Sequence, residues 1–92
     1  MNEIRIPQSI WTDIRQHLFQ NEDEHFAFLL VENYNVKNHT VFLVKEIIKI
    51  KEEETETDFF ALKMKTDSLL RVINIANSKK LGLVEIHNHF SG

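Results

Sequence analysis

Residues 26–31 have the sequence Phe26-Ala27-Phe28-Leu29-Leu30-Val31, which is the longest uninterrupted apolar run in the chain. An apolar run of strand length without polar alternation is typical of a β-strand that is buried on both faces. Residues 33–39 are rich in turn-forming side chains, and residues 40–50 form a long β-branched segment. The pattern therefore predicts a doubly buried strand that makes a hairpin with the segment after it.

A first helix is predicted over residues 8–20, before the hairpin. Apolar residues recur there every four positions and indicate one buried face, which holds Ile10, Ile14 and Leu18. Pro7 stands where the first turn of a helix tolerates proline. We expect Trp11 to lie in the core together with five phenylalanines, which are Phe26, Phe28, Phe42, Phe59 and Phe60.

The rest of the chain predicts a second helix between two further strands, at residues 59–64 and 81–86. Thr66 is expected to cap the helix, and its buried face is expected to hold Leu69, Leu70, Ile73 and Ala76 or Ile75. The acidic segment 51–58 is expected to be a solvated loop or strand end rather than a binding patch. The order β, α, β, β, β, α, β predicts an α/β (α+β) fold, in which helices flank a mixed sheet in one domain over residues 1–92.

The composition limits the classes of function. A chain of 92 residues allows one domain, and 11 Lys and Arg against 14 Asp and Glu give a net charge of −3. This acidity argues against binding that is driven by nucleic-acid phosphates. No apolar run approaches the roughly 20 residues needed to cross a bilayer, and the first residues do not have the layout of a signal peptide. The chain also has no cysteine, which is compatible with a reducing compartment. From these observations together, we expect a cytoplasmic protein that binds neither membranes nor nucleic acid.

The strand predicted at residues 81–86 leads directly into His87-Asn88-His89. Residues two apart on a strand point to the same side, so both imidazoles can reach one metal ion. Zinc accepts two such nitrogens at about 2.0–2.1 Å, and catalytic zinc sites add a third protein ligand and a water molecule. Because His-x-His also recurs by chance, two partly solvated histidines at a strand end are the alternative interpretation.

Glu24 is the second candidate, because it stands between the first helix and the buried strand. A carboxylate at this point could face a metal site at the strand end and take a proton from bound water as a general base. In the alternative interpretation, Glu22, Asp23 and Glu24 only solvate a loop. We expect structural roles for the other histidines, which are His17, His25 and His39.

Together these segments resemble the JAB/MPN (JAMM) metalloprotease family. Residues 23–30, Asp-Glu-His-Phe-Ala-Phe-Leu-Leu, are similar to the family segment in which a catalytic glutamate precedes an apolar strand. Residues 82–89, Gly-Leu-Val-Glu-Ile-His-Asn-His, are similar to the family strand that runs into His-x-His. The resemblance implies an MPN/JAB-like (cytidine-deaminase-like) fold that is truncated after the His-x-His strand.

The resemblance also implies a chemistry. His87 and His89 would be zinc ligands, and Glu24 would be the general base on the zinc-bound water. The expected reaction is hydrolysis of an isopeptide or peptide bond at the C-terminal tail of a ubiquitin-like or sulfur-carrier protein. An E1-like activating enzyme is a further expected partner, and self-association of the chain is also expected.

Three departures from the family pattern bear on these expectations. Asn88 stands where deubiquitinating members mostly have serine, and Phe90 stands where proline is usual. The family's Ser-x-x-Asp, whose aspartate is the third zinc ligand, would lie beyond Gly92. We therefore expect the natural sequence to continue and this 92-residue chain alone to be inactive. Two alternatives stay open: a non-catalytic MPN-like scaffold or dimerisation module, and an accessory domain of a RadC-like protein.

Overall fold

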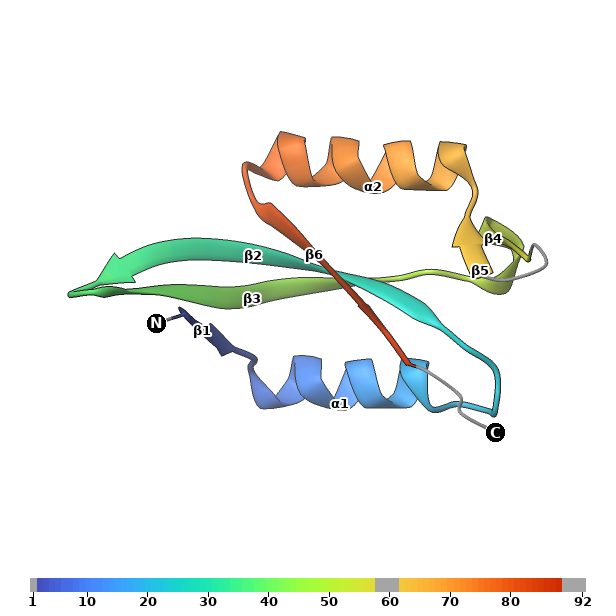
Figure 1. Cartoon of the computed structure of the whole chain (residues 1–92), viewed down its shortest axis with the longest axis horizontal. Helices are drawn as coiled ribbons and strands as arrows, with labels where there is room; N and C mark the ends of the chain where they lie inside the picture. Colours follow the sequence, from blue (N-terminus) through green and yellow to red (C-terminus); the bar gives the residue numbers. More distant parts are fainter. Residues whose placement is uncertain (1, 58–61, 89–92) are drawn as a thin grey trace.

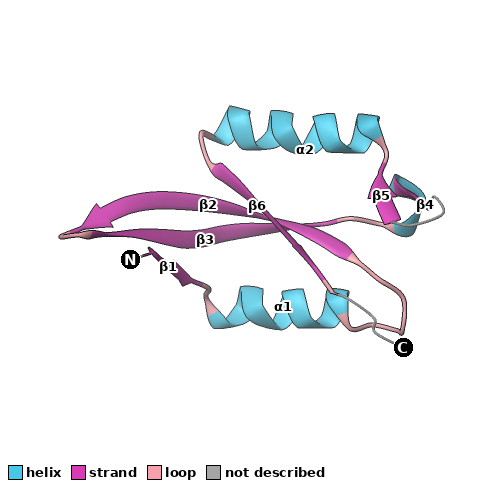
Figure 2. Ribbon diagram, viewed as in Figure 1, coloured by secondary structure: helices cyan, strands magenta, loops and turns pink. Residues whose placement is uncertain are grey.

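A curled mixed sheet with a helix on each side forms the α+β fold of the computed structural model, which describes residues 2–57 and 62–88 (Figures 1 and 2). The elements are β1 (Asn2–Arg5), α1 (Gln8–Leu18), β2 (Phe26–Val36), β3 (His39–Lys49), a 3-10 turn (Glu52–Glu54), β4 (Thr55–Thr57), β5 (Leu62–Met64), α2 (Thr66–Lys79) and β6 (Gly82–His87). Neither helix in these ranges combines the length and the apolar character that crossing a membrane requires.

The main sheet has the strand order β1-β3-β2-β6. β2 and β3 form the predicted antiparallel hairpin, and their turn contains Lys37 with a positive φ of 54°. β6 runs antiparallel to β2 on its other side, whereas β1 runs parallel to β3, which makes the sheet mixed. β4 and β5 form a separate two-stranded sheet, so the structure contains one more short strand than the sequence predicted.

The first half of β2 is covered on both faces, as its sequence predicted. Every side chain from Phe26 to Val31 is buried, because α1 lies against one face of the sheet and α2 lies over the other (Figure 2). The cluster under α1 contains Ile14, Leu18, Leu29, Val31 and Val44. The cluster under α2 contains Phe26, Phe28, Ile50 and Val72.

The predicted buried face of α2 is only partly right. Val72 and Ala76 are buried, whereas Leu69, Leu70 and Ile73 are 38%, 52% and 37% exposed. With 3.6 residues per turn, Leu70 lies roughly 160° around the helix from Val72. The apolar stripe of α2 is therefore wider than the surface that the sheet offers it. The predicted cap is wrong, because Lys65 is the N-cap residue and no capping hydrogen bond from a side chain is present among the described residues.

The prediction that Trp11 lies in the core is also wrong, because its side chain is 40% exposed. Ile14 and Leu18 of α1 are buried against the sheet, and Ile10 packs beside them. Trp11 follows Ile10 and is turned roughly 100° away from it around the helix. Of the phenylalanines expected in the core, Phe26 and Phe28 are buried and Phe42 packs against the cluster under α1, while Phe59 and Phe60 lie outside the described residues.

Candidate functional site

The start of β2 and the end of β6 meet at one corner of the sheet. The register pairs Phe26 with His87, and Glu24 lies two residues before Phe26 on the connection from α1. Figure 1 shows that this connection and the end of β6 lie together near the end of α1. We call residues 23–26 and 87–88 the β2–β6 corner, which contains both sequence segments that pointed to chemistry.

Asn88 joins the two sides of the β2–β6 corner through three hydrogen bonds. Its side-chain Oδ1 accepts a hydrogen bond from the backbone N–H of His25 at 2.7 Å. Its Nδ2 donates to the backbone carbonyl of Asp23 at 3.2 Å, and its backbone N–H donates to the carbonyl of His25 at 3.4 Å. We call these contacts the Asn88 bridge. Through it, the segment that carries Glu24 is held against the end of the strand that carries His87.

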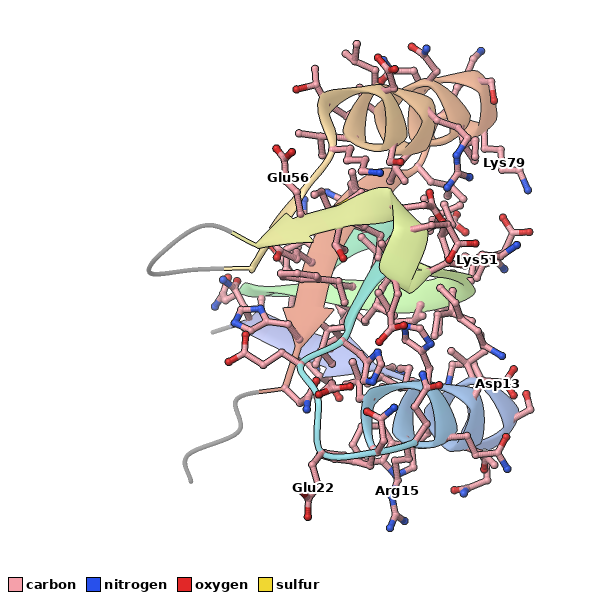
Figure 3. The ribbon with its side chains drawn as sticks, turned by 90° about the vertical axis from the view of Figure 1, so that its right-hand side faces the viewer. Asp13, Arg15, Glu22, Lys51, Glu56 and Lys79 are labelled. Atoms are coloured by element: carbon pink, nitrogen blue, oxygen red, sulfur yellow. The ribbon has the colours of Figure 1, made fainter. Side chains whose placement is uncertain are left out.

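The three acids before β2 differ in their surroundings. Glu22 points away from the fold into solvent (Figure 3), and Asp23 is exposed, whereas Glu24 is half-buried. The interpretation that these acids only solvate a loop therefore describes Glu22 better than Glu24. His87 has a side chain that is 38% exposed, with Nδ1 3.7 Å from Oε1 of Glu85. Its imidazole ring also lies 5.6 Å from the ring of Phe26, centroid to centroid.

A pair of histidines lies behind the β2–β6 corner, with ring centroids 5.6 Å apart. His25 is only 5% exposed, and its Nε2 contacts Oδ1 of Asn21 at 2.7 Å. His17 contacts the carbonyl of Phe26 through Nε2 at 2.5 Å. Burial lowers the pKa of His17 below its usual 6.5. The hydrogen bond to the Phe26 carbonyl raises this pKa, but electrostatic interactions with His25 and Lys49 lower it further. The neutral imidazole is therefore the favoured form of His17 near neutral pH.

Asn21 and Asn88 are polar residues of this region whose contacts the sequence did not predict. Asn21 Oδ1 accepts from the backbone N–H of Asp23 at 2.9 Å as well as contacting His25. In the sequence, Asn88 stood out only as a departure from a family pattern, and nothing singled out Asn21. Both are asparagines at the ends of regular elements, where such side chains commonly bond to backbone groups.

The predicted zinc ligands of this region are His87 and His89, and Glu24 is the predicted general base. The structure brings Glu24 and His87 to the same corner, while His89 lies outside the described residues. Within residues 2–57 and 62–88, no three His, Cys, Asp or Glu side chains gather closely enough to hold a metal ion. The described residues therefore do not provide a full set of zinc ligands by themselves, since catalytic zinc sites use three protein ligands.

Comparisons with known proteins leave the family open. The chain matches no protein-family model, and neither the curated proteins nor the solved structures contain a significant match. The resemblance to JAB/MPN domains thus depends on the residues quoted above, and the function has to be inferred from the geometry of the β2–β6 corner.

Proposed function

We propose that the β2–β6 corner belongs to the active site of a zinc-dependent metallopeptidase of the isopeptidase type, with a JAB/MPN-type fold. The observation that supports this proposal is the Asn88 bridge. His25 and Asn88 are 63 positions apart in the sequence, yet the backbone of one is bonded to the side chain of the other. An active site built from Glu24 and the His-x-His segment requires this juxtaposition.

In this proposal the residues have separate roles. His87 and His89 hold the zinc ion, with a further ligand from outside the described residues. Zinc, when bound, supplies a Lewis acid that polarises the scissile carbonyl and lowers the pKa of water. Glu24 takes a proton from the attacking water and returns it to the leaving amine. The exposed imidazole of His87 suits a site that a large substrate must reach.

The proposed substrate is the C-terminal tail of a ubiquitin-like or sulfur-carrier protein, and an E1-like activating enzyme is a proposed partner. β6 bonds to β2 along one edge, and no other strand of the described residues pairs with it. An extended peptide can add to a strand edge through backbone hydrogen bonds. A tail lying along β6 would lead its scissile bond to His87, at the end of that strand.

Zinc content and hydrolysis test the proposal in the protein made from its complete gene. We expect about one zinc per chain in the wild type, loss of zinc in His87→Ala and in His89→Ala, and retained zinc with hydrolysis lowered roughly 10²- to 10⁴-fold in Glu24→Gln. The substrate is a ubiquitin-like protein with a fluorogenic amide at its C-terminus. His39→Ala is the matched control, because His39 lies at the start of β3 and contacts Glu3 at 3.6 Å. Zinc that stays bound after both His87 and His89 are replaced would refute the assignment.

A non-catalytic scaffold or dimerisation module is the second candidate. It is favoured by large apolar side chains on the outer surface, which include Trp11, Phe19, Leu70 and Ile73 at 40%, 66%, 52% and 37% exposure. Trp11 and Phe19 line one hollow beside α1, and neighbouring exposed apolar groups of this kind are where a partner could bind. This candidate predicts a stable oligomer by light scattering and no stoichiometric zinc. A zinc-bound monomer would contradict it.

A further inference from the structure

The side chain of Asn88 contacts the backbone on both sides of Glu24. The carbonyl of Asp23 belongs to the peptide unit before Glu24, and the N–H of His25 belongs to the peptide unit after it. A backbone N–H can only donate and a carbonyl can only accept, so the two partners fix the orientation of the Asn88 amide. The Asn88 bridge therefore restrains both peptide units of Glu24.

The bonds of Asn88 differ from the other bonds made in this connection. Asn21 contacts Asp23 and His25, so its bonds stay within the segment between α1 and β2. The bonds of Asn88 cross to the end of β6 and tie the segment to another element. Since Asn88 directly follows His87, a shift of the Glu24 backbone has to move the end of β6 that carries His87 or break the bridge.

We propose that Asn88 is a positioning residue that sets the place of the Glu24 carboxylate relative to His87. The catalytic part of this inference rests on the proposed function, whereas the backbone restraint does not. Asparagine suits the task because its planar amide offers one acceptor and one donor at the same time. Aspartate in its place keeps the acceptor for His25 but loses the donor for Asp23, and alanine loses both.

The restraint is tested without any activity, by NMR measurement of the hydrogen-exchange rate of the His25 backbone amide. We expect roughly tenfold faster exchange in Asn88→Ala, because one net hydrogen bond is lost. Asn88→Asp should stay close to the wild type, because its carboxylate still accepts from His25. If the alanine variant does not fold, roughly tenfold faster exchange in Asn88→Asp overturns the restraint. Asn35→Ala is the control, since Asn35 accepts from Thr40 Oγ1 at 3.0 Å at the far end of the hairpin. An unchanged rate in Asn88→Ala would overturn the restraint.

The catalytic consequence is tested by steady-state kinetics on the zinc-loaded protein. We expect Asn88→Ala to bind zinc like the wild type but to lower kcat roughly 10- to 100-fold, as misplacing a catalytic group does. KM should stay within roughly twofold, because the substrate-binding surface is intact. In a Glu24→Gln background, the same replacement should have no further effect on kcat, because it acts through Glu24.

Two results separate this inference from the proposed function. An unchanged kcat in Asn88→Ala, or an equal loss in the Glu24→Gln background, overturns the positioning role while the peptidase assignment stands. A wild-type protein that neither binds zinc nor cleaves the tail overturns the assignment and the catalytic role together. In that case the exchange rate of the His25 amide still tests whether Asn88 restrains the Glu24 backbone, because this measurement needs neither zinc nor substrate.

Discussion

The orientation of α2 can be tested by replacing one buried and one exposed apolar residue of the same helix. Val72 is fully buried against Phe26, Phe28 and Ile50, whereas Leu70 is 52% exposed. Val72→Ala removes two methyl groups, which costs about 1.6 kcal/mol of transfer free energy, and the cavity adds up to about 1 kcal/mol. The better helix propensity of alanine returns about 0.5 kcal/mol. We therefore expect a loss of about 2 kcal/mol in the free energy of unfolding.

Leu70→Ala removes more atoms but should cost less. Water already reaches half of this side chain, so no cavity forms, and we expect a loss below about 1 kcal/mol. Urea denaturation followed by far-UV circular dichroism compares the two variants. The midpoint should fall by about 1–2 M for Val72→Ala and by less than about 0.5–1 M for Leu70→Ala. A larger loss for Leu70→Ala would refute this orientation, because α2 would then bury its other face.

Three further predictions concern the buried face of α1, the ion pair between α2 and Glu54, and the pKa of His17. Leu18→Ala should lower the free energy of unfolding by about 2–5 kcal/mol, because Leu18 is only 4% exposed. Phe19→Ala at the adjacent, 66% exposed position should change it by no more than about 0.5 kcal/mol. The same urea assay measures both. Burial raises the pKa of the Glu54 carboxyl, but the stronger combined effect of its hydrogen bonds, chiefly from Arg71, holds this pKa below the usual 4.5. A lowered carboxyl pKa stabilises the fold above the ordinary value of 4.5, and this contribution is lost as the pH falls through the lowered value. Arg71→Ala should therefore lose about 0.5–1 kcal/mol at neutral pH and progressively less as the pH falls below 4.5. A loss that does not shrink in acid would contradict this. Burial lowers the pKa of His17, so the folded state binds fewer protons than the unfolded state. Tm should therefore fall as the pH is lowered from about 7.5 to about 5.5. His17→Gln should reduce that fall, and a Tm profile identical to that of the wild type would exclude His17 as its source.

Local sequence pattern predicted much of the fold because its strongest signals are short-range. The doubly buried start of β2 and the hairpin with β3 follow from an unbroken apolar run and a turn-rich segment, and both are confirmed. The face of α2 could not be predicted in the same way. Its apolar residues occupy more than half of the helix circumference, so their spacing alone does not say which of Leu70 and Val72 meets the sheet. That choice depends on the position of Phe26 and Phe28, which only the assembled sheet defines.

The sequence drew attention to candidate site residues but not to the contacts between their segments. The sequence drew attention to Glu24 and His87, and the structure places both at one corner, while the proposed zinc chemistry stays a prediction. The Asn88 bridge was not predictable, because a bond between a side chain and backbone groups 63 and 65 positions away leaves no periodic signal.

The strand order has a consequence for the order of folding. β2 pairs with β3 across a tight turn at Lys37, and hairpins of this kind form in roughly 1–10 μs. The pairing of Phe26 with His87, which are 61 positions apart, instead requires closure of about two thirds of the chain, which costs more chain entropy and comes later. We therefore expect substitutions in the Lys37 turn to change the folding rate, and substitutions at Asn88 to change mainly the unfolding rate. The β2–β6 corner would then form after the β2–β3 hairpin and open before it.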